Sequence, residues 1–404
     1  KGRERQDLFS LEAIHTISEN EELTFRLLPS SVRYKNTDWT FRPDAEISYN
    51  SKNNRWSVAA FQARAQEQRI ALEGTYANNE AYSIQTQLEQ VALEGLLPEF
   101  KNFSIQGDVS LKLDTNRSPA KNNFDLNMDV AALSFNEKAM GEFALSLFGN
   151  NQVGSYTSAL TFFKNGKTTL SGEGNILNTN KQPSINFDLE FDAFRLDFLN
   201  QLANGTLDEI QGMASGMVNL WGPLNALRHD GELRISEGGL SIPYLNLFYA
   251  FDPKTRIVLA NQSFNFSKAV FRNTAFDTKG IIDGSYSHSN FKNWEMDFAI
   301  STDRMLVFNI EESPERIFYG QGFFGGTGKL VGPSKSLRIS LVGETEEGTN
   351  FKIPWTEDYG LVDTSYIDFV SKTKKDSLET TDAVVGLGRK ILEMDFELDI
   401  NDKA

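Results

Sequence analysis

Few side chains in this sequence have the types and the spacing that chemistry requires. Segment 320–325, GQGFFG, matches the glycine pattern of a dinucleotide-binding loop, but that motif needs a helix directly after it. The chain instead continues as TGKLVG, which is typical of a strand. In TGKLVG, Leu330 follows Lys329, whereas a phosphate-binding loop has a Ser or Thr at this position. We therefore interpret these glycines as positions where a strand bends or packs closely.

A second pattern resembles the start of a calcium loop. Asp125, Asn127 and Asp129 have the spacing of the first ligands, but Val130 replaces the glycine that such a loop needs. Alternate residues of a strand share one face of a sheet. We therefore predict that these side chains form a solvated face.

The residues that most often serve catalysis or metal binding are scarce. The three histidines, His15, His229 and His288, lie far apart without ligand spacing, and we expect each to be a surface or packing residue. Cysteine is absent, which excludes thiolate metal sites, thiol nucleophiles and disulfides. No Ser-His-Asp grouping or carboxylate pair stands out. The sequence predicts a protein that is not an enzyme and has no metal or cofactor.

The composition is that of a folded, acidic protein. Of the 404 residues, 40% are apolar and 24% are charged, which excludes disorder as the main state. The formal net charge of −15 disfavours binding to nucleic acid or to an anionic membrane surface. No apolar run approaches the ~18 residues of a membrane-spanning helix. Because the chain starts at Lys1 in a polar stretch, we expect it to be a piece of a longer protein whose anchor lies outside it.

Apolar and polar residues alternate with a period of two along most of the chain, which indicates half-buried strands. Clear examples are 105–113, 123–130, 142–148, 184–191, 294–300 and 337–341. Asn165-Gly166, between two such runs, is a hairpin signal. Segment 194–205 differs and predicts a short helix that stops at Gly205. We predict an all-β chain, an elongated curled sheet (a β-taco, or open rolled sheet) with an apolar interior groove and at most one or two short helices.

A weak repeat relates segments 216–228 and 326–338, which both fit G-x-x-x-L-x-G-P-x-x-x-L-R. We interpret it as a strand–turn–strand device used twice. Pro223 and Pro333 would then lie at strand ends, where a missing N–H is harmless.

Composition hardly shifts between Leu23 and Pro354, so no boundary between globular domains stands out. The chain can still be divided by pattern. The expected parts are repetitive strands over 1–190, a short helix or linker over 191–211, a β-region over 212–356, a mobile loop over 357–392 and a further, truncated strand over 393–404.

Apolar side chains lie on one face of the predicted strands, and polar ones such as Arg234, Asp283 and Lys329 lie on the opposite face. The candidate lining residues of the apolar face are Val218, Leu220, Leu233, Ile235, Ile257, Leu259, Phe264, Phe266, Phe276, Ile282, Met296, Phe298, Leu306, Phe308, Phe324, Leu330, Leu337, Ile339, Leu341 and Phe351. Such a face must be covered or filled. The pattern alone favours a filled sandwich core, and the alternative is a rolled sheet whose apolar interior stays open to lipid chains.

The order of sequence segments from about residue 190 to residue 400 identifies a protein family more specifically than the two-residue alternation does. This part of the chain resembles the C-terminal region of TamB-type proteins. The segments that carry the resemblance are GGLSIPYLN, HSNFKNW, FYGQGFFGGTGKLVGP and EEGTNFKIP. TamB is the inner-membrane subunit of the translocation and assembly module and belongs to the AsmA-like superfamily. The likeness is greatest to the forms associated with Bacteroidota. Residues 1–190 resemble the family only in their alternating pattern.

The resemblance implies a periplasmic bridge of cell-envelope biogenesis that carries phospholipids between the inner and outer membranes along a hydrophobic groove. It implies an inner-membrane anchor, which this chain lacks, and a partner of the Omp85 barrel class (TamA-like) in the outer membrane. The alternative role is a scaffold or chaperone for outer-membrane protein assembly. The family supplies no catalytic residues. On this view, Gly216, Gly326 and Gly328 would keep the interior from filling. From a different class, a secreted β-protein acting on polysaccharide would need aromatic platforms and a carboxylate pair, which the sequence does not offer.

Overall fold

The computed structural model describes residues 9–19, 21–35, 37–77, 81–98, 104–179, 182–201, 208–313, 318–333, 336–353 and 391–399. Within these ranges the chain forms 26 strands of a mixed sheet, one four-residue α-helix and two short 3₁₀ segments. The prediction of an all-β fold with very little helix is confirmed. The chain divides into two compact units, of which unit 1 comprises Lys1–Phe194 with Asn219–Leu224 and unit 2 comprises Arg195–Val218 with Asn225–Ala404.

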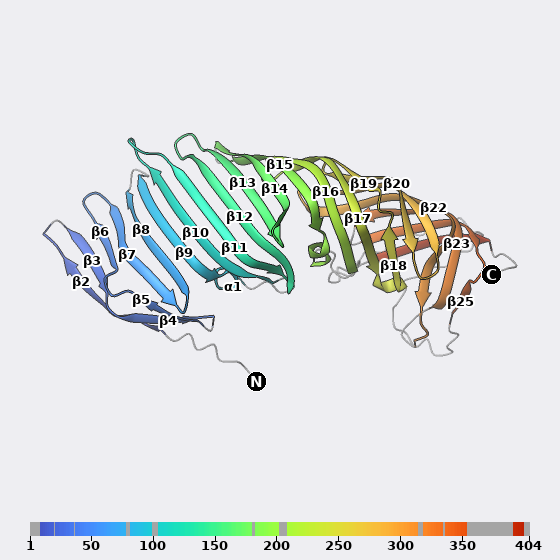
Figure 1. Cartoon of the computed structure of the whole chain (residues 1–404), viewed down its shortest axis with the longest axis horizontal. Coiled ribbons are helices and arrows are strands. Elements are labelled where there is room, and N and C mark those ends of the chain that lie inside the picture. The colour runs from blue at the N-terminus through green and yellow to red at the C-terminus, as the bar shows by residue number, and fades with distance from the viewer. Residues whose placement is uncertain are drawn as a thin grey trace, which may run out of the picture. The chain divides into compact units, whose positions relative to one another are not determined.

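Unit 1 holds the first fifteen strands of the chain, drawn in blue to green in Figure 1. Its elements are β1 (Phe9–Ser10), β2 (Ala13–Ile17), β3 (Glu22–Leu27), β4 (Ser30–Tyr34), β5 (Thr37–Phe41), β6 (Glu46–Asn50), β7 (Arg55–Ala65), β8 (Gln68–Ala77), β9 (Tyr82–Ala92), α1 (Leu93–Leu96), β10 (Ile105–Arg117), β11 (Phe124–Phe135), β12 (Lys138–Asn150), β13 (Ser155–Lys164), β14 (Lys167–Thr179) and β15 (Gln182–Arg195).

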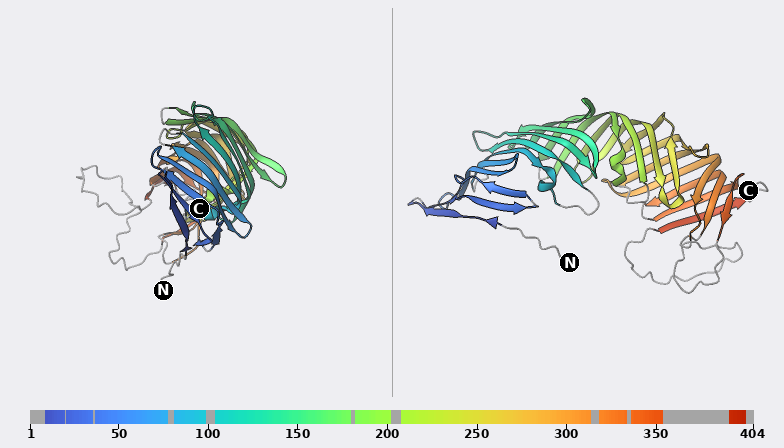
Figure 2. Two further views of the ribbon diagram at one scale, coloured as in Figure 1. Left: turned by 90° about the vertical axis from the view of Figure 1, so that its left-hand side faces the viewer. Right: turned by 60° about the horizontal axis from the view of Figure 1, so that its bottom comes forward.

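From β7 to β15 each strand pairs antiparallel with the next one along the chain. Strand β7 also pairs with β6 through its first half and with β5 through Ala63 and Arg64, so the sheet branches there. In Figure 2 these strands lie side by side and turn progressively, which curls the sheet of this unit.

Unit 2 holds the remaining elements, drawn in yellow to red in Figure 1, except that the end of β16 from Asn219 onward belongs to unit 1. They are η1 (Asp197–Gln201), β16 (Asp208–Pro223), β17 (Arg228–Ile242), η2 (Pro243–Leu245), β18 (Leu247–Phe251), β19 (Thr255–Asn261), β20 (Ser263–Asn273), β21 (Thr278–Ser289), β22 (Lys292–Ile310), β23 (Tyr319–Pro333), β24 (Ser336–Thr345), β25 (Asn350–Lys352) and β26 (Ile391–Asp399).

Long strands in unit 2 pair with two shorter ones each. Strand β17 pairs with β19 through its first half and with β18 through its second half, and β18 and β19 both pair with β20. The ladder continues antiparallel through β21, β22, β23 and β24. Strand β26 joins β24 in parallel, which makes the sheet a mixed one.

The Asn165-Gly166 pair and the Gly-Pro pairs of the sequence lie at a turn and at strand ends in the structure. Asn165 and Gly166 both have positive φ, at 52° and 75°, and connect Lys164 directly to its partner Lys167. This is the backbone of a type I′ turn, so the hairpin prediction is confirmed. Pro223 and Pro333 are the last residues of β16 and β23, as the repeat predicts.

Segments 194–205 and 357–392 are the parts of the chain for which the sequence predicts a helix and a loop. The short helix predicted over 194–205 is confirmed in part, because a 3₁₀ helix spans Asp197–Gln201, but it begins later than predicted, since β15 continues to Arg195. Phe194 stays in the strand because its ring is buried and meets Phe162 at 5.5 Å. Gly205, the expected stop, lies outside the described residues. So does the loop expected over 357–392, apart from its last two positions, which belong to β26.

Candidate functional site

The central strands of unit 1 present a continuous apolar face. Residues directly opposite one another in an antiparallel pair project to the same face. Such rows include Leu113, Leu126 and Leu147, and beside them Leu111, Met128, Leu145 and Leu160. All of these side chains are half-buried.

Many leucines at the centre of this face are only partly buried. The described strands of unit 1 belong to one sheet, and α1 is the one helix among its described residues. A facing second sheet would bury the inner residues of both layers. Val91, Val109 and Val130, which lie opposite one another where α1 contacts β9 and β10, are buried, and so are Leu170 and Phe187 in later strands. The rows of leucines are buried less completely than these residues.

The few polar groups on this face are bonded within the protein. Ser158, opposite Leu147, is buried and donates its hydroxyl to the carbonyl of Ser146 at 3.0 Å. The hydroxyl of Thr115 accepts a hydrogen bond from the Nδ2 of Asn151 at 2.9 Å. The face consequently offers a ligand apolar contact and few free hydrogen-bonding groups.

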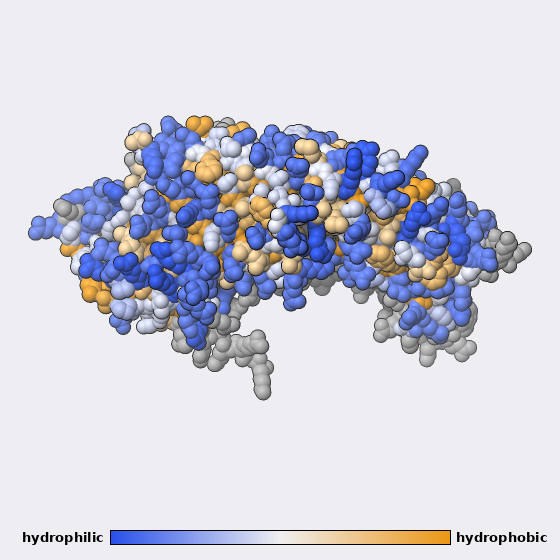
Figure 3. Space-filling model, in the orientation of Figure 1, coloured by the Kyte–Doolittle hydropathy of each residue, from blue (hydrophilic) through white to orange (hydrophobic). Residues whose placement is uncertain are grey.

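The opposite face of the same strands is polar. Lys112, Asn127 and Ser146 occupy directly opposite positions there. Asp125 and Asn127 hydrogen-bond to each other, with 2.9 Å between Oδ1 and Nδ2. On the side of the molecule seen in Figure 3, hydrophilic residues (blue) predominate and hydrophobic ones (orange) show in groups between them.

In unit 2 the register brings many of the predicted lining residues into rows. One row carries Leu233, Ile257, Phe266, Phe298, Leu330 and Ile339, and the rows beside it carry Leu259, Phe264 and Met296, and Ile282 and Leu341. Val218 approaches the row of Leu259 across Gly231.

Exposure of the candidate lining residues varies from buried to open. The buried ones are Val218, Ile235, Leu259, Phe298, Leu306 and Phe324. Half-buried are Leu220, Leu233, Ile257, Phe264, Phe266, Phe276, Ile282, Met296, Phe308, Leu330, Leu337, Ile339 and Leu341, while Phe351 is exposed. The lining role of each residue stays a prediction.

Part of the predicted set lies in a packed cluster instead of an open row. Leu306 is 1% exposed and belongs to a cluster with Leu247, Tyr249, Phe271, Met305 and Phe323. Phe276 packs against the same cluster. The hydroxyl of Tyr249 donates to the carbonyl of Leu306 at 2.7 Å, and burial raises the pKa of this phenol. Phe308 and Phe351 are instead in ring contact at 5.7 Å.

Glycine lets aromatic rings meet across a strand. Phe266 of β20 and Phe298 of β22 both lie opposite Gly284 of β21, and their ring centroids are 5.6 Å apart. Gly284 has a φ of 142°, and an added Cβ would lie 2.1 Å from the carbonyl oxygen of Asp297. Only glycine adopts this backbone region without strain.

The glycines expected to keep the interior from filling do not do so. An added Cβ at Gly216 would lie 2.1 Å from the carbonyl oxygen of Glu232, and one at Gly328 would lie 2.6 Å from Cδ2 of Leu341. At Gly326 the carbonyl oxygen of Val342 would be 2.4 Å away. This expectation is corrected, because these glycines allow neighbouring strands and side chains to approach closely.

A pair of histidines is the feature that spacing in the sequence could not reveal. His229 and His288 are 1% and 7% exposed, and their Nε2 atoms are 2.8 Å apart. Phe264, Phe291 and Trp294 surround them at ring-centroid distances of 4.3 to 4.7 Å from one or other imidazole. Burial lowers the pKa of both, that of His288 to about 4. His15 is exposed.

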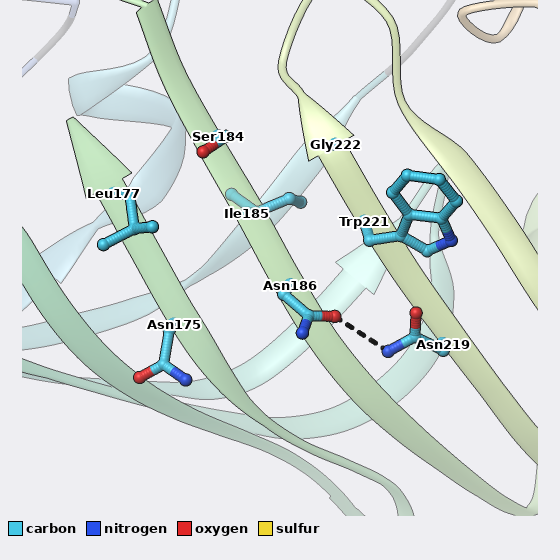
Figure 4. Close-up of a pocket in the computed structure, with 8 residues that line it drawn as sticks. All are labelled: Asn175, Leu177, Ser184, Ile185, Asn186, Asn219, Trp221 and Gly222. Carbon is cyan, nitrogen blue, oxygen red and sulfur yellow. Dashed lines mark hydrogen bonds between the residues drawn. The ribbon is translucent and has the colours of Figure 1, made fainter. Parts of the chain in front are cut away.

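A shallow hollow lies on the polar face of β14, β15 and β16 in unit 1 (Figure 4). Its lining comprises Asn175, Leu177, Ser184, Ile185, Asn186, Asn219, Trp221 and Gly222. The Nδ2 of Asn219 donates to Oδ1 of Asn186 and to Oδ1 of Asp188, both at 2.9 Å. These amides thus serve to connect β16 to β15.

The described residues were expected to hold no metal site or nucleotide-binding loop. Within them, no group of three or more His, Asp or Glu side chains could hold a metal ion. Segment 320–325 lies inside β23, so the backbone that follows it is a strand. No helix in these ranges has the length and apolar character needed to cross a bilayer.

No family model, no curated protein and no solved structure matches the chain.

Proposed function

We propose that this chain is a segment of a periplasmic bridge that carries phospholipids between the inner and outer membranes, with the acyl chains against the apolar face. The observation that carries the proposal is the set of leucine rows in unit 1, which stay only half-buried on strands that all belong to one sheet. The membrane location and a barrel partner of the Omp85 class rest on the sequence resemblance alone.

The energetics of this face suit an acyl chain. Each methylene removed from water gains about 0.8 kcal/mol, so even a part of one tail bound along the leucine rows is held appreciably. The polar groups on the face, such as Ser158, already have partners within the protein. A tail can therefore move from row to row without breaking hydrogen bonds.

Site-specific photo-crosslinking tests the proposal with matched pairs of neighbouring positions. Leu147 and Leu330 lie on the apolar face, whereas Phe148 and Val331 lie on the opposite face and are 46% and 39% exposed. A photoreactive phenylalanine analogue is placed at one of these positions at a time. Each variant is mixed with phosphatidylethanolamine vesicles that contain a radiolabelled tracer lipid.

The proposal predicts strong lipid labelling at Leu147 and Leu330 and weak labelling at Phe148 and Val331. Surface hydrophobicity alone predicts the reverse order, because the control positions are exposed apolar residues. Equal or reversed labelling refutes the lipid proposal. Repeating the experiment in cells distinguishes the assembly-scaffold alternative, in which the same apolar positions capture polypeptide instead of lipid.

A further inference from the structure

The buried histidine pair connects strands that are distant in the sequence. His229 lies at the start of β17 and His288 near the end of β21, and their Nε2 atoms are 2.8 Å apart. His229 lies opposite Asn261 at the end of β19, and the backbone N–H of His288 donates to the carbonyl of Gln262 at 2.9 Å. The pair thus joins the ends of β17, β19 and β21 at one margin of unit 2.

The hydrogen bonds around the pair determine where the protons lie. The backbone N–H of Phe291 donates to Nδ1 of His288 at 3.0 Å, so this nitrogen carries no proton. A neutral imidazole has one proton, which places it on Nε2 of His288, from where it is donated to Nε2 of His229. The proton of His229 must then be on Nδ1, which is buried without a hydrogen-bond partner.

This arrangement accommodates neither an added proton nor a metal ion. A proton on Nδ1 of His288 would face the N–H of Phe291, and a proton on Nε2 of His229 would face the N–H of His288. A metal held between the two Nε2 atoms would likewise require His288 to move its proton to Nδ1.

The surroundings favour the neutral form. Phe264, Phe291 and Trp294, from β20, the β21–β22 turn and β22, pack on the imidazoles and carry no charge. Among the described residues, Asp230 of β17 is the charged group that acts on His229, and it favours a proton there. Its Oδ1 accepts the N–H of Asn261 at 3.2 Å, and desolvation outweighs its effect.

We propose that His229 and His288 form an acid-labile clamp, in which uptake of one proton breaks a hydrogen bond of the pair and releases the end of β17 from β21 and β22. The clamp lies at the margin of the apolar face of unit 2, because His229 and His288 continue the strands that carry Gly231 and Tyr286. It is independent of any lipid.

The direction of the pH effect follows from the lowered pKa values. The opened form, with ordinary histidines that titrate near 6.5, binds more protons than the closed form below that pH. Opening is therefore favoured as the pH falls from 6.5 towards the pKa of His288, about 4. At pH 5 one such histidine shifts the opening equilibrium roughly 30-fold.

Nitrogen-detected NMR of the whole chain with labelled histidine tests the clamp without a destabilising variant. Only three imidazoles contribute signals, and the variant His15→Asn identifies the exposed one. The clamp predicts one buried histidine protonated at Nδ1, the other protonated at Nε2, and both neutral at pH 6. Two identical tautomers, or titration of both buried histidines near pH 6.5, would overturn it.

Hydrogen exchange at pH 7.5 and pH 5, corrected for the intrinsic rate, provides the second readout. Peptides covering 226–231 and 286–293 should lose protection at pH 5, whereas peptides from β11 and β12 of unit 1 should not. Equal protection at both pH values refutes the clamp. Addition of Zn²⁺ that shifts both tautomers to Nδ1 would show a metal site instead and would also refute it.

Discussion

Replacing Gly284 with alanine tests whether the rows of unit 2 depend on close packing across β21. The new Cβ would lie 2.1 Å from the carbonyl oxygen of Asp297 and 2.8 Å from Cα of Phe298. Because the φ of 142° is open only to glycine, the backbone must rotate or remain strained, at a cost of about 1–3 kcal/mol. Separating the rings of Phe266 and Phe298 adds about 0.5–1.5 kcal/mol.

We expect Gly284→Ala to lower the free energy of unfolding of unit 2 by about 2–4 kcal/mol. Urea denaturation followed by tryptophan fluorescence measures the loss, and hydrogen exchange of peptides from β21 and β22 assigns it to this unit. With m values of about 1–3 kcal/mol/M, the midpoint should fall by roughly 1–2 M.

The control is Gly95→Ala in α1, where nothing lies within 4 Å of an added Cβ. Alanine should leave stability unchanged there or raise it by about 0.5–1 kcal/mol. A Gly284→Ala protein as stable as the Gly95→Ala protein would refute the role of close packing across β21.

Three further predictions concern packing and pH. Leu306→Ala, in the packed cluster, should cost about 2–5 kcal/mol of unfolding free energy, whereas Leu145→Ala, on the open face, should cost clearly less; equal losses in urea denaturation would mean that the face is filled. Tyr249→Phe should cost about 1–2 kcal/mol, because the buried carbonyl of Leu306 loses its phenol donor; an unchanged urea midpoint would show that the bond contributes little. The unfolding free energy of unit 2 should fall as the pH drops below about 6.5, because His229 and His288 bind protons more readily when unfolded, by on the order of 1 kcal/mol per pH unit; an unfolding free energy that urea titrations find unchanged between pH 6.5 and pH 5 would contradict this.

The strands and their faces were predictable from the sequence because a strand with one buried face has apolar side chains at every second residue. Leu126, Met128 and Val130 lie on one face of β11, as their spacing indicates. The turn at Asn165-Gly166 was predictable for an equally local reason, since both residues tolerate positive φ.

The sequence could not show contacts that depend on the register of strands distant along the chain. His229 and His288 meet because of the ladder from β17 through β19 and β20 to β21. The register shift between Thr302 and Met305 places two consecutive residues, Met305 and Leu306, in the packed cluster. Alternation cannot anticipate such a bulge.

Whether an apolar face is filled or open also cannot be read from its alternation. A sandwich core and an open face require the same pattern, and only the presence of a second layer distinguishes them. The leucines of unit 1, such as the opposite pair Leu145 and Leu160, are half-buried in the structure, and the comparison of Leu145→Ala with Leu306→Ala tests whether their face is filled.

Lipid analysis of the purified chain tests the central claim most directly. The parent, Leu145→Asp on the apolar face and Phe148→Asp on the opposite face are purified without added lipid, checked for folding by circular dichroism, extracted and examined by mass spectrometry. The account predicts stoichiometric phospholipid in the parent and in Phe148→Asp, and a clear loss in folded Leu145→Asp. A folded parent without phospholipid would contradict it.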